Sequence, residues 1–203
     1  MPVEQIRVGS DNFSYLVYDG RTRLAALVDP GFDASRAMEM IMNLSLDLKY
    51  LVNTHHHGDH AGDNSSVLGS TDAKLVLSSA ERPDLRKRAD VLVDDDQKLN
   101  LGDISLGFIH TPGHTPGSVC ILVDDEFLIT GDTLFIGDCG RCDLPGGSIE
   151  DMFRSLQRLK ELDEGLIVLP GHDYGSIPSD SLGSQKRISN VLLARSLDEF
   201  SRL

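Results

Sequence analysis

Cysteine is scarce in this sequence, and its scarcity bears on the compartment in which the chain folds. Only three cysteines occur among 203 residues: Cys120, Cys139 and Cys142. An odd and low number argues against a disulfide framework and favours a reducing compartment. The first residues also lack a basic segment followed by an apolar one, so we expect no signal peptide. Both absences predict a cytoplasmic protein.

Long apolar runs and excess positive charge are missing as well. No stretch approaches the ~20 apolar residues that a membrane-spanning helix needs, so we expect no membrane partner. With 19 Lys and Arg against 32 Asp and Glu, the formal net charge is −13. Nucleic-acid binding depends mainly on neutralising phosphates, so this charge argues against a nucleic-acid partner. The same charge would raise the local concentration of cations.

The length and patterning of the chain predict one α/β domain over residues 1–203. Short apolar runs typical of buried strands alternate with stretches of helical periodicity. Two halves with similar strand-rich patterns suggest two sheets packed face to face, with helices outside. The predicted strands are 24–28, 50–52, 75–77, 104–109, 119–123, 127–129 and 166–169, and the predicted helices are 33–46, 79–87, 148–162 and 184–200.

The densest group of potential metal ligands is the segment 54–60, which reads Thr-His-His-His-Gly-Asp-His. Neutral imidazole is the commonest metal ligand in proteins, and such a cluster offers little to a hydrophobic core. Further candidates stand far along the chain, in a Pro-Gly-His, a Gly-Asp-Thr and a Pro-Gly-His-Asp context: His114, Asp132 and His172. All follow strand ends or glycine-proline turns, where open α/β sheets place their sites, so we expect them to converge.

The spacing within the cluster indicates two metal positions. Alternate residues of an extended segment point the same way, so two of the histidines can share one ion. Gly58 permits a turn that redirects the following aspartate and histidine toward a second ion. Two metals held ~3.5–4 Å apart can activate a bridging water, whose pKa falls to near ~7. The first position is predicted to use His55, His57 and His114; the second is predicted to use Asp59, His60 and His172; Asp132 bridges them.

Some polar residues near these candidates have other expected roles. His56 lies between two candidate ligands, so we expect it to point to the opposite side and to pack or hydrogen-bond there. His110 lies in an apolar strand and is predicted to be a buried, hydrogen-bonded side chain. Asp29 is either a loop acid or a partner that fixes the tautomer of a histidine. Cys139 and Cys142 could indicate redox chemistry or a zinc pair, and we favour two free thiols near the pocket rim.

The ordered ligand set of the chain resembles that of the metallo-β-lactamase superfamily. The similarity runs from Asp29-Pro30-Gly31 to the C-terminal region and thus covers nearly the whole chain. It implies a four-layer αββα sandwich, with the metals at one edge between the two sheets. It also implies the same division of the seven ligands between two ions, and a homodimer is expected from the family.

Two further segments resemble one branch of that superfamily, which contains glyoxalase II and persulfide dioxygenases. They are Thr130–Phe135 with Cys139-Gly140-Arg141, and Pro170–Tyr174. The resemblance to glyoxalase II, which usually has lysine where Arg141 stands, implies a hydrolase of thioesters such as S-lactoylglutathione. Two divalent ions (Zn, Fe or Mn) would then supply a metal-activated hydroxide. The predicted catalytic residues are Asp59, which would orient this hydroxide, and Asp132, which would bridge the ions.

Substrate contacts and an alternative chemistry follow from the same resemblance. Candidate substrate-binding residues are Arg141, Tyr174 and Lys186; an ion pair is the alternative for Arg141, and a solvated helix surface is the alternative for Lys186. A persulfide dioxygenase would oxidise glutathione persulfide to sulfite with one Fe(II). Its ligands here would be His55, His114 and Asp132, although that family usually has threonine where Cys142 stands. The third hypothesis is a non-catalytic metal-binding protein.

Overall fold

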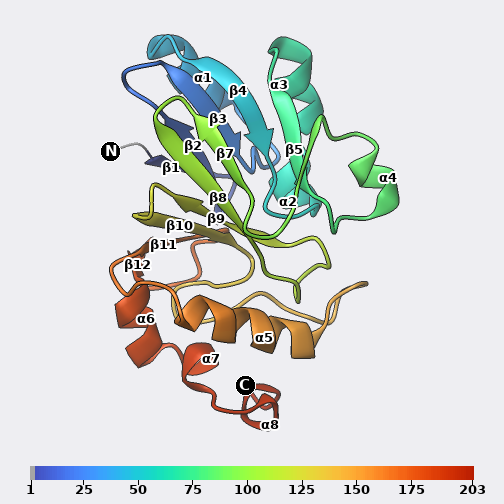
Figure 1. Cartoon of the computed structure of the whole chain (residues 1–203), viewed down its shortest axis with the longest axis vertical. Helices are drawn as coiled ribbons and strands as arrows, with labels where there is room; N and C mark the ends of the chain where they lie inside the picture. The colour runs from blue at the N-terminus through green and yellow to red at the C-terminus, as the bar shows by residue number, and fades with distance from the viewer. Residues whose placement is uncertain (1–2) are drawn as a thin grey trace.

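The computed structural model describes residues 3–203, which form two six-stranded β-sheets with helices on their outer faces (Figure 1). The first sheet is built by the N-terminal half of the chain and the second by the C-terminal half. In order across the first sheet, the strands are β1 (Val3–Val8), β2 (Asn12–Tyr18), β3 (Leu24–Val28), β4 (Asp47–Val52), β5 (Lys74–Ser78) and β6 (Val91–Val93). Across the second they are β12 (Asp180–Ser181), β11 (Ile167–Pro170), β10 (Phe127–Gly131), β9 (Val119–Val123), β8 (Ile104–His110) and β7 (Lys98–Leu101).

Both sheets mix antiparallel and parallel pairs. In the first sheet β1, β2 and β3 are antiparallel neighbours, whereas β3 to β6 run parallel. In the second sheet β7 to β10 are antiparallel, β10 and β11 are parallel, and β12 is antiparallel to β11. The parallel strands matter for the site because their carboxyl ends lie at one edge of each sheet, and loops from these ends can meet.

The apolar core between the sheets combines side chains from both. Tyr15 of the first sheet and Phe108 and Ile121 of the second are each almost completely buried in this single cluster. Each such side chain contributes roughly 1.5–3 kcal/mol by leaving water. This shared core therefore holds the two sheets together.

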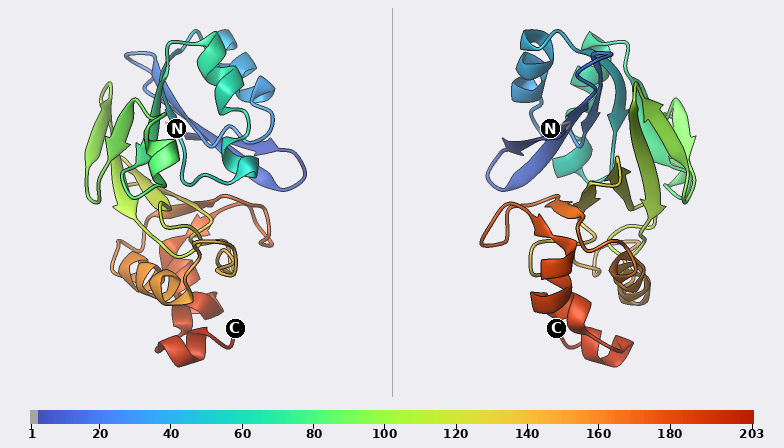
Figure 2. Two further views of the ribbon diagram at one scale, coloured as in Figure 1. Left: turned by 90° about the vertical axis from the view of Figure 1, so that its right-hand side faces the viewer. Right: turned by 60° about the vertical axis from the view of Figure 1, so that its left-hand side comes forward.

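Helices complete the outer layers of the sandwich (Figure 2). Residues of α1 (Ser35–Asn43) and α3 (Asn64–Ser70) pack on the first sheet, among them Ala37, Ile41 and Val67. The second sheet is covered by α5 (Ile149–Lys160), α6 (Leu182–Ile188), α7 (Asn190–Leu193) and α8 (Leu197–Phe200). Two single-turn helices, α2 (Gly58–Ala61) and α4 (Pro83–Arg86), lie in loops. The layers confirm the predicted αββα sandwich.

Every predicted strand is present, but two predicted helices are wrong in extent. The predicted helix 79–87 is limited to α4, which begins at Pro83. Proline cannot continue a helix that began at residue 79, but it fits the first turn of a new one. The predicted helix 184–200 is three short helices. Ser189 has extended backbone angles (φ −77°, ψ 119°) and ends α6, and Ser196 begins α8 by accepting a hydrogen bond from the Glu199 N–H. The Ser196 hydroxyl competes for a backbone group in this way, which favours a helix boundary.

Strands β1, β2, β6, β7 and β12 were not predicted from the sequence pattern. None of the helices in residues 3–203 combines the length and the apolar character needed to cross a membrane. The single domain over residues 1–203 stays a prediction.

Candidate metal centre

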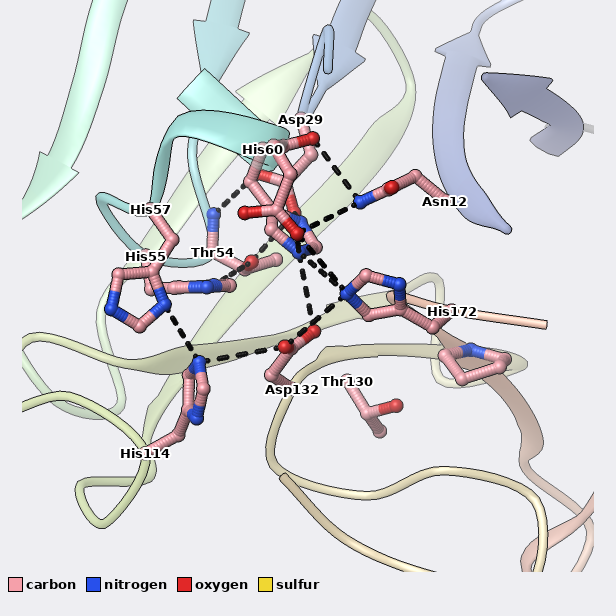
Figure 3. A network of polar contacts seen from close by, with 12 residues as sticks. Asn12, Asp29, Thr54, His55, His57, His60, His114, Thr130, Asp132 and His172 are labelled. Atoms are coloured by element: carbon pink, nitrogen blue, oxygen red, sulfur yellow. Dashed lines mark hydrogen bonds and ion pairs between the residues drawn. The ribbon is translucent and has the colours of Figure 1, made fainter. Parts of the chain in front are cut away.

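The candidate ligands reach one edge of the sandwich from both sheets (Figure 3). The segment that follows β4, together with α2, carries four of them. The other three follow strands of the second sheet, after β8, β10 and β11. The structure thus brings together all seven residues that the sequence singled out: His55, His57, Asp59, His60, His114, Asp132 and His172.

These residues form two groups with a shared carboxylate. The first group is His55, His57 and His114, and the second is Asp59, His60 and His172. Within each group, one ligand atom of each residue lies within 4.8 Å of the ligand atoms of the other two. Asp132 lies between the groups. Its Oδ2 is 3.4 Å from His114 Nε2 and 3.4 Å from His172 Nε2, and its Oδ1 is 3.3 Å from His60 Nε2. This arrangement matches the predicted division, while the ligand roles themselves stay a prediction.

The donor set fits divalent cations. His57 Nδ1 lies 2.8 Å from His114 Nε2, and His60 Nε2 lies 3.2 Å from His172 Nε2, so ring nitrogens converge on common points. Among residues 3–203, the buried atoms His55 Nε2 and Asp132 Oδ1 have no hydrogen-bond partner. Buried polar atoms nearly always have a hydrogen-bond partner. Atoms without one that lie beside other potential metal ligands are typical of ion sites. Imidazole nitrogen and carboxylate oxygen suit zinc, iron and manganese.

Protonation differs between the two groups. Burial, with the nearby His60, holds the pKa of His55 well below its usual value, and burial also lowers the pKa of His57. Both rings are therefore neutral and can donate a lone pair. Although burial acts in the opposite direction, hydrogen bonds to Asp132 and Asp59 raise the pKa of His172 to about 9. A cation binding there would have to displace this proton, which makes metal binding and proton release linked events.

Asp29 and Thr54 fix the orientation of one histidine in each group. Asp29 Oδ1 accepts a hydrogen bond from the Thr54 N–H (2.8 Å), and its Oδ2 accepts one from Thr54 Oγ1 (2.6 Å). The same Oδ2 is 3.0 Å from His60 Nδ1, and Thr54 Oγ1 is 3.1 Å from His55 Nδ1. Because the Thr54 hydroxyl gives its hydrogen to Asp29, it can accept one from His55. Both rings then carry their hydrogen on Nδ1 and present Nε2 to the site. Asp29 is thus placed as the partner that fixes tautomers.

Backbone atoms of Cys139-Gly140-Arg141 hold two further candidates. His114 Nδ1 donates to the Arg141 carbonyl (2.7 Å), and the Gly140 N–H donates to the Asp132 carbonyl (3.0 Å). A Cβ atom on residue 140 would lie 2.0 Å from the Asp132 carbonyl oxygen, so only glycine fits there. The sequence suggested a role only for the side chain of Arg141, whereas the structure shows that its main-chain carbonyl also orients His114.

Five of the seven candidate ligands, all except His55 and His60, line a pocket of about 540 Å³, a volume in the range of small-molecule sites. Phe135, Leu144 and Tyr174 supply apolar walls. The ring of Tyr174 stacks on that of His172, with centroids 4.7 Å apart and an interplanar angle of 8°. Arg141 lines the pocket with a guanidinium that pairs with Asp143 (2.6 and 2.7 Å).

The remaining candidates lie outside the ligand groups. Lys186 does not line the pocket; its ammonium donates to the Leu162 carbonyl (2.8 Å) on the far side of the second sheet. His56 turns away from the ligands and pairs with buried Glu81 (2.8 Å), as predicted. The Nε2 of His110 donates to the Pro116 carbonyl (2.8 Å), and this half-buried ring stays outside the centre.

The cysteines are all free thiols. Cys139 lines the pocket, whereas Cys142 lies beside it without being part of the lining. Burial raises the pKa of the Cys139 thiol to about 12 and that of Cys142 to about 11. Because the thiolate is the form that attacks disulfides and binds metals, neither residue is activated at neutral pH. This agrees with two free thiols near the rim.

One buried contact of the centre had no sequence signal. Asn12, at the start of β2, directs its side-chain amide at Asp59, with Nδ2 3.3 Å from Oδ2 and 3.2 Å from the Asp59 carbonyl oxygen. The two residues are 47 positions apart, and Asn12 lies in a strand that the sequence pattern did not predict.

Comparison with known proteins identifies the relatives of this chain. A family model described as the metallo-beta-lactamase superfamily matches residues 8–172. A probable polyketide biosynthesis zinc-dependent hydrolase, PksB of Bacillus subtilis, is 34% identical over 184 residues, which cover 89% of this chain and 81% of that protein. The hydroxyacylglutathione hydrolase of Pelagibacter ubique is 33% identical over 86% of this chain and 72% of its own length.

Persulfide dioxygenases are similar to the same extent. Human mitochondrial persulfide dioxygenase ETHE1 is 32% identical over 200 residues, covering 96% of this chain and 76% of that protein. The crystal structure of ETHE1 from Myxococcus xanthus superposes with a TM-score of 0.90 at 31% identity, over 98% of this chain and 88% of the other. Relatives of both kinds thus match most of the length of this chain.

Proposed function

The chain belongs to the metallo-β-lactamase superfamily, and from this premise we propose that it is a metal-dependent hydrolase of an acyl thioester of the S-lactoylglutathione type. The observation that carries the proposal is the second complete ligand group. A mononuclear iron site needs only His55, His114 and Asp132, whereas here Asp59, His60 and His172 also converge. Two-metal centres are typical of hydrolases.

In the proposed centre each group would hold one divalent ion, zinc, iron or manganese, and Asp132, which lies between the groups, would serve as a ligand of both. When bound, such ions polarise an acyl carbonyl group and lower the pKa of water toward neutrality. The protein's part is to fix the ligand atoms in place before substrate arrives. Asp29, Thr54 and the Arg141 carbonyl do this by holding the hydrogens of His55, His60 and His114 on their Nδ1 atoms.

Asp59 is the proposed residue for handling the proton of the attacking water. Its side chain is 33% exposed and faces the pocket, whereas Asp132 is 9% exposed and lies deeper. A hydrogen bond from His172, followed by the charge of His60, holds the pKa of Asp59 well below its usual range. The carboxylate is therefore ionised and can accept a hydrogen bond that orients a water molecule. A thiolate leaving group needs little protonation because thiols have a pKa near ~8.5.

The pocket walls suit a substrate with an apolar acyl portion and a charged thiol portion. Tyr174, 58% exposed, offers a ring face at the rim, and Phe135 packs edge-on against it. Arg141 is the proposed contact for a carboxylate of a glutathione-type thiol, which would take the place of Asp143 at its guanidinium. Lys186 is not included in this proposal because its ammonium is bonded to the Leu162 carbonyl.

Oxidation of glutathione persulfide is the second candidate function. The similarity to persulfide dioxygenases over nearly the whole chain favours it, as does the 3.4 Å separation of His114 Nε2 and Asp132 Oδ2. Two histidines and one carboxylate are the ligands of many non-haem iron oxygenases.

Metal content and two assays on the same preparation test these functions. We expect about two metal equivalents per chain by elemental analysis, cleavage of S-lactoylglutathione, and no oxygen uptake with glutathione persulfide. One iron per chain with oxygen uptake would overturn the hydrolase in favour of the dioxygenase. Bound metal without turnover of thioesters, esters or lactones would support the non-catalytic alternative. His57→Ala should abolish cleavage, whereas His110→Ala, the same change outside the ligand groups, should leave it within about threefold of wild type.

A further inference from the structure

Asn12 is the point at which the N-terminal hairpin meets the centre. It is 8% exposed, and its side chain points into the cluster of candidate ligands (Figure 3). Its single amide nitrogen has two hydrogens, and two acceptors of Asp59 lie within reach: Oδ2 at 3.3 Å and the carbonyl oxygen at 3.2 Å. Asp59 Oδ2 is also the atom that lies 3.4 Å from His172 Nε2 and 3.6 Å from His60 Nε2. Asn12 therefore contacts the very oxygen that the second ligand group shares.

The same short segment holds the loop of His172 through its backbone. Asn12 and His172 form an antiparallel bridge, and the Phe13 N–H donates to the Gly171 carbonyl (2.8 Å). The Asp173 N–H donates to the Asp11 carbonyl (2.7 Å). The start of β2 thus holds two of the three members of the second group. The Asn12 side chain contacts Asp59, and main-chain hydrogen bonds hold the loop of His172.

The first ligand group is supported by other parts of the chain. His55 is held by Thr54, and His114 is held by the Arg141 carbonyl. Within residues 3–203, both side-chain hydrogen bonds of Asn12 go to Asp59. The Asn12 side chain thus contacts a member of the second group and no member of the first, whereas Asp29 reaches both groups through Thr54 and His60.

We infer that Asn12 is a positioning residue that sets how tightly the Asp59–His60–His172 position holds its ion, with little influence on the His55–His57–His114 position. This inference rests on the proposed two-metal centre. Asp59 is one-third exposed, so without the amide its carboxylate can turn toward solvent. Removing a hydrogen-bond partner of a metal ligand typically weakens metal binding 10–100-fold. Asn12 would thereby decide whether the centre contains one ion or two at limiting metal concentration.

Stepwise metal affinity tests this inference without reference to activity. Metal-free full-length protein is titrated with zinc against a chromophoric chelator, for wild type, Asn12→Ala and Asn12→Asp. In Asn12→Ala we expect one binding step to weaken about 10–100-fold and the other to change less than about threefold. Asn12→Asp replaces the donor with a carboxylate that cannot bond to ionised Asp59, so a change confined to the same step is expected. Asn12→Ser keeps a small polar side chain and serves if the alanine variant does not fold.

Gln5→Ala is the matched control, because this amide on the neighbouring β1 donates to Tyr15 and to the Pro178 carbonyl, away from the ligands. It should leave both steps unchanged. Two steps in wild type that are unaltered in the Asn12 variants, or that weaken equally together with the melting temperature, would overturn the inference and leave the proposed function intact. A single equivalent in wild type would overturn the two-metal proposal itself, and the inference with it.

Discussion

Asp29 shows that a single side chain can act on both ligand groups without lining the pocket. Its carboxylate is bonded to Thr54 and to His60, and through Thr54 it also orients His55. The residue has a positive φ of 51°, a conformation that aspartate and asparagine tolerate better than most residues. Position 29, in the Asp-Pro-Gly turn after β3, therefore needs a residue that tolerates a positive φ as well as one that carries a negative charge.

Replacing Asp29 by Asn should separate these two roles. Asparagine accepts the turn, but its NH₂ group cannot accept a hydrogen from Thr54 or His60, so at least one of the three hydrogen bonds of Asp29 must break. We expect zinc affinity to fall about 10–100-fold and the free energy of unfolding to fall by about 1–3 kcal/mol. Chelator competition and urea denaturation measure these quantities. Asp33→Asn, the same change in the same loop at a residue whose carboxylate accepts from the Ser35 N–H, is the control. Equal effects of both substitutions would contradict the role of Asp29.

At the scale of elements, helix α5 supports the loop that carries His114. Its N-cap is Ser148, whose hydroxyl accepts a hydrogen bond from the Asp151 N–H, and Glu150 and Asp151 complement the helix dipole in the first turn. The Ser148 N–H in turn donates to the Gly113 carbonyl (2.8 Å). The start of the helix is thereby fixed against the residue that precedes His114.

Gly113→Ala should disturb the centre through this contact. Gly113 has a φ of +145°, and a Cβ there would lie 2.4 Å from the Met152 Cα atom. Since helix backbone cannot move aside locally, the loop must shift, and we expect a loss of about 1–3 kcal/mol in unfolding free energy together with reduced metal content. Gly107→Ala in β8 is the matched control, because its Cβ would have an ordinary 3.6 Å contact with Leu122. Urea denaturation and elemental analysis of both variants check the expectation; retention of full metal content in Gly113→Ala would contradict it.

The same scale shows what the sequence could and could not predict. Apolar runs were sufficient for strands such as β3 and β9, whereas β2 contains Asn12 and Ser14, which are buried only because they find partners in Asp59 and the Val28 carbonyl. Those partners lie in other segments of the chain, so the local sequence pattern cannot predict these contacts. The convergence of the seven candidates was predictable because His and Asp are common metal ligands and their order along the chain resembles that of the superfamily. The supports of the ligands, including Asn12 and Gly140, were not, because they act through tertiary contacts.

At the scale of the whole molecule, the candidate ligands connect the two sheets. Four come from the first sheet and its loop, and three come from the second. An ion bound by both halves stabilises only the state in which the sheets are docked. Its removal should therefore affect the stability of the entire fold as well as activity.

Metal removal should lower the melting temperature reversibly. A ligand at 100 times its Kd adds about 2.7 kcal/mol to the free energy of unfolding. For a chain of this size each kcal/mol corresponds to about 2–4 °C. We therefore expect EDTA to lower the melting temperature by about 5–11 °C, measured by scanning calorimetry, and added zinc to restore it. EDTA saturated with zinc is the control. An unchanged melting temperature after verified metal loss would show that the ions do not connect the sheets.

Because the candidate ligands extend from His55 to His172, the centre cannot be complete until the strands of the second sheet have been synthesised. The histidine cluster emerges from the ribosome early, but its partners belong to strands made later, and domains generally fold as units. On the proposed ligand assignment, a nascent chain can offer the cluster of the first sheet to any metal in the cell. The pair of positions exists only after the second sheet has docked. Metal selection would therefore take place at the end of biosynthesis, on an already folded protein.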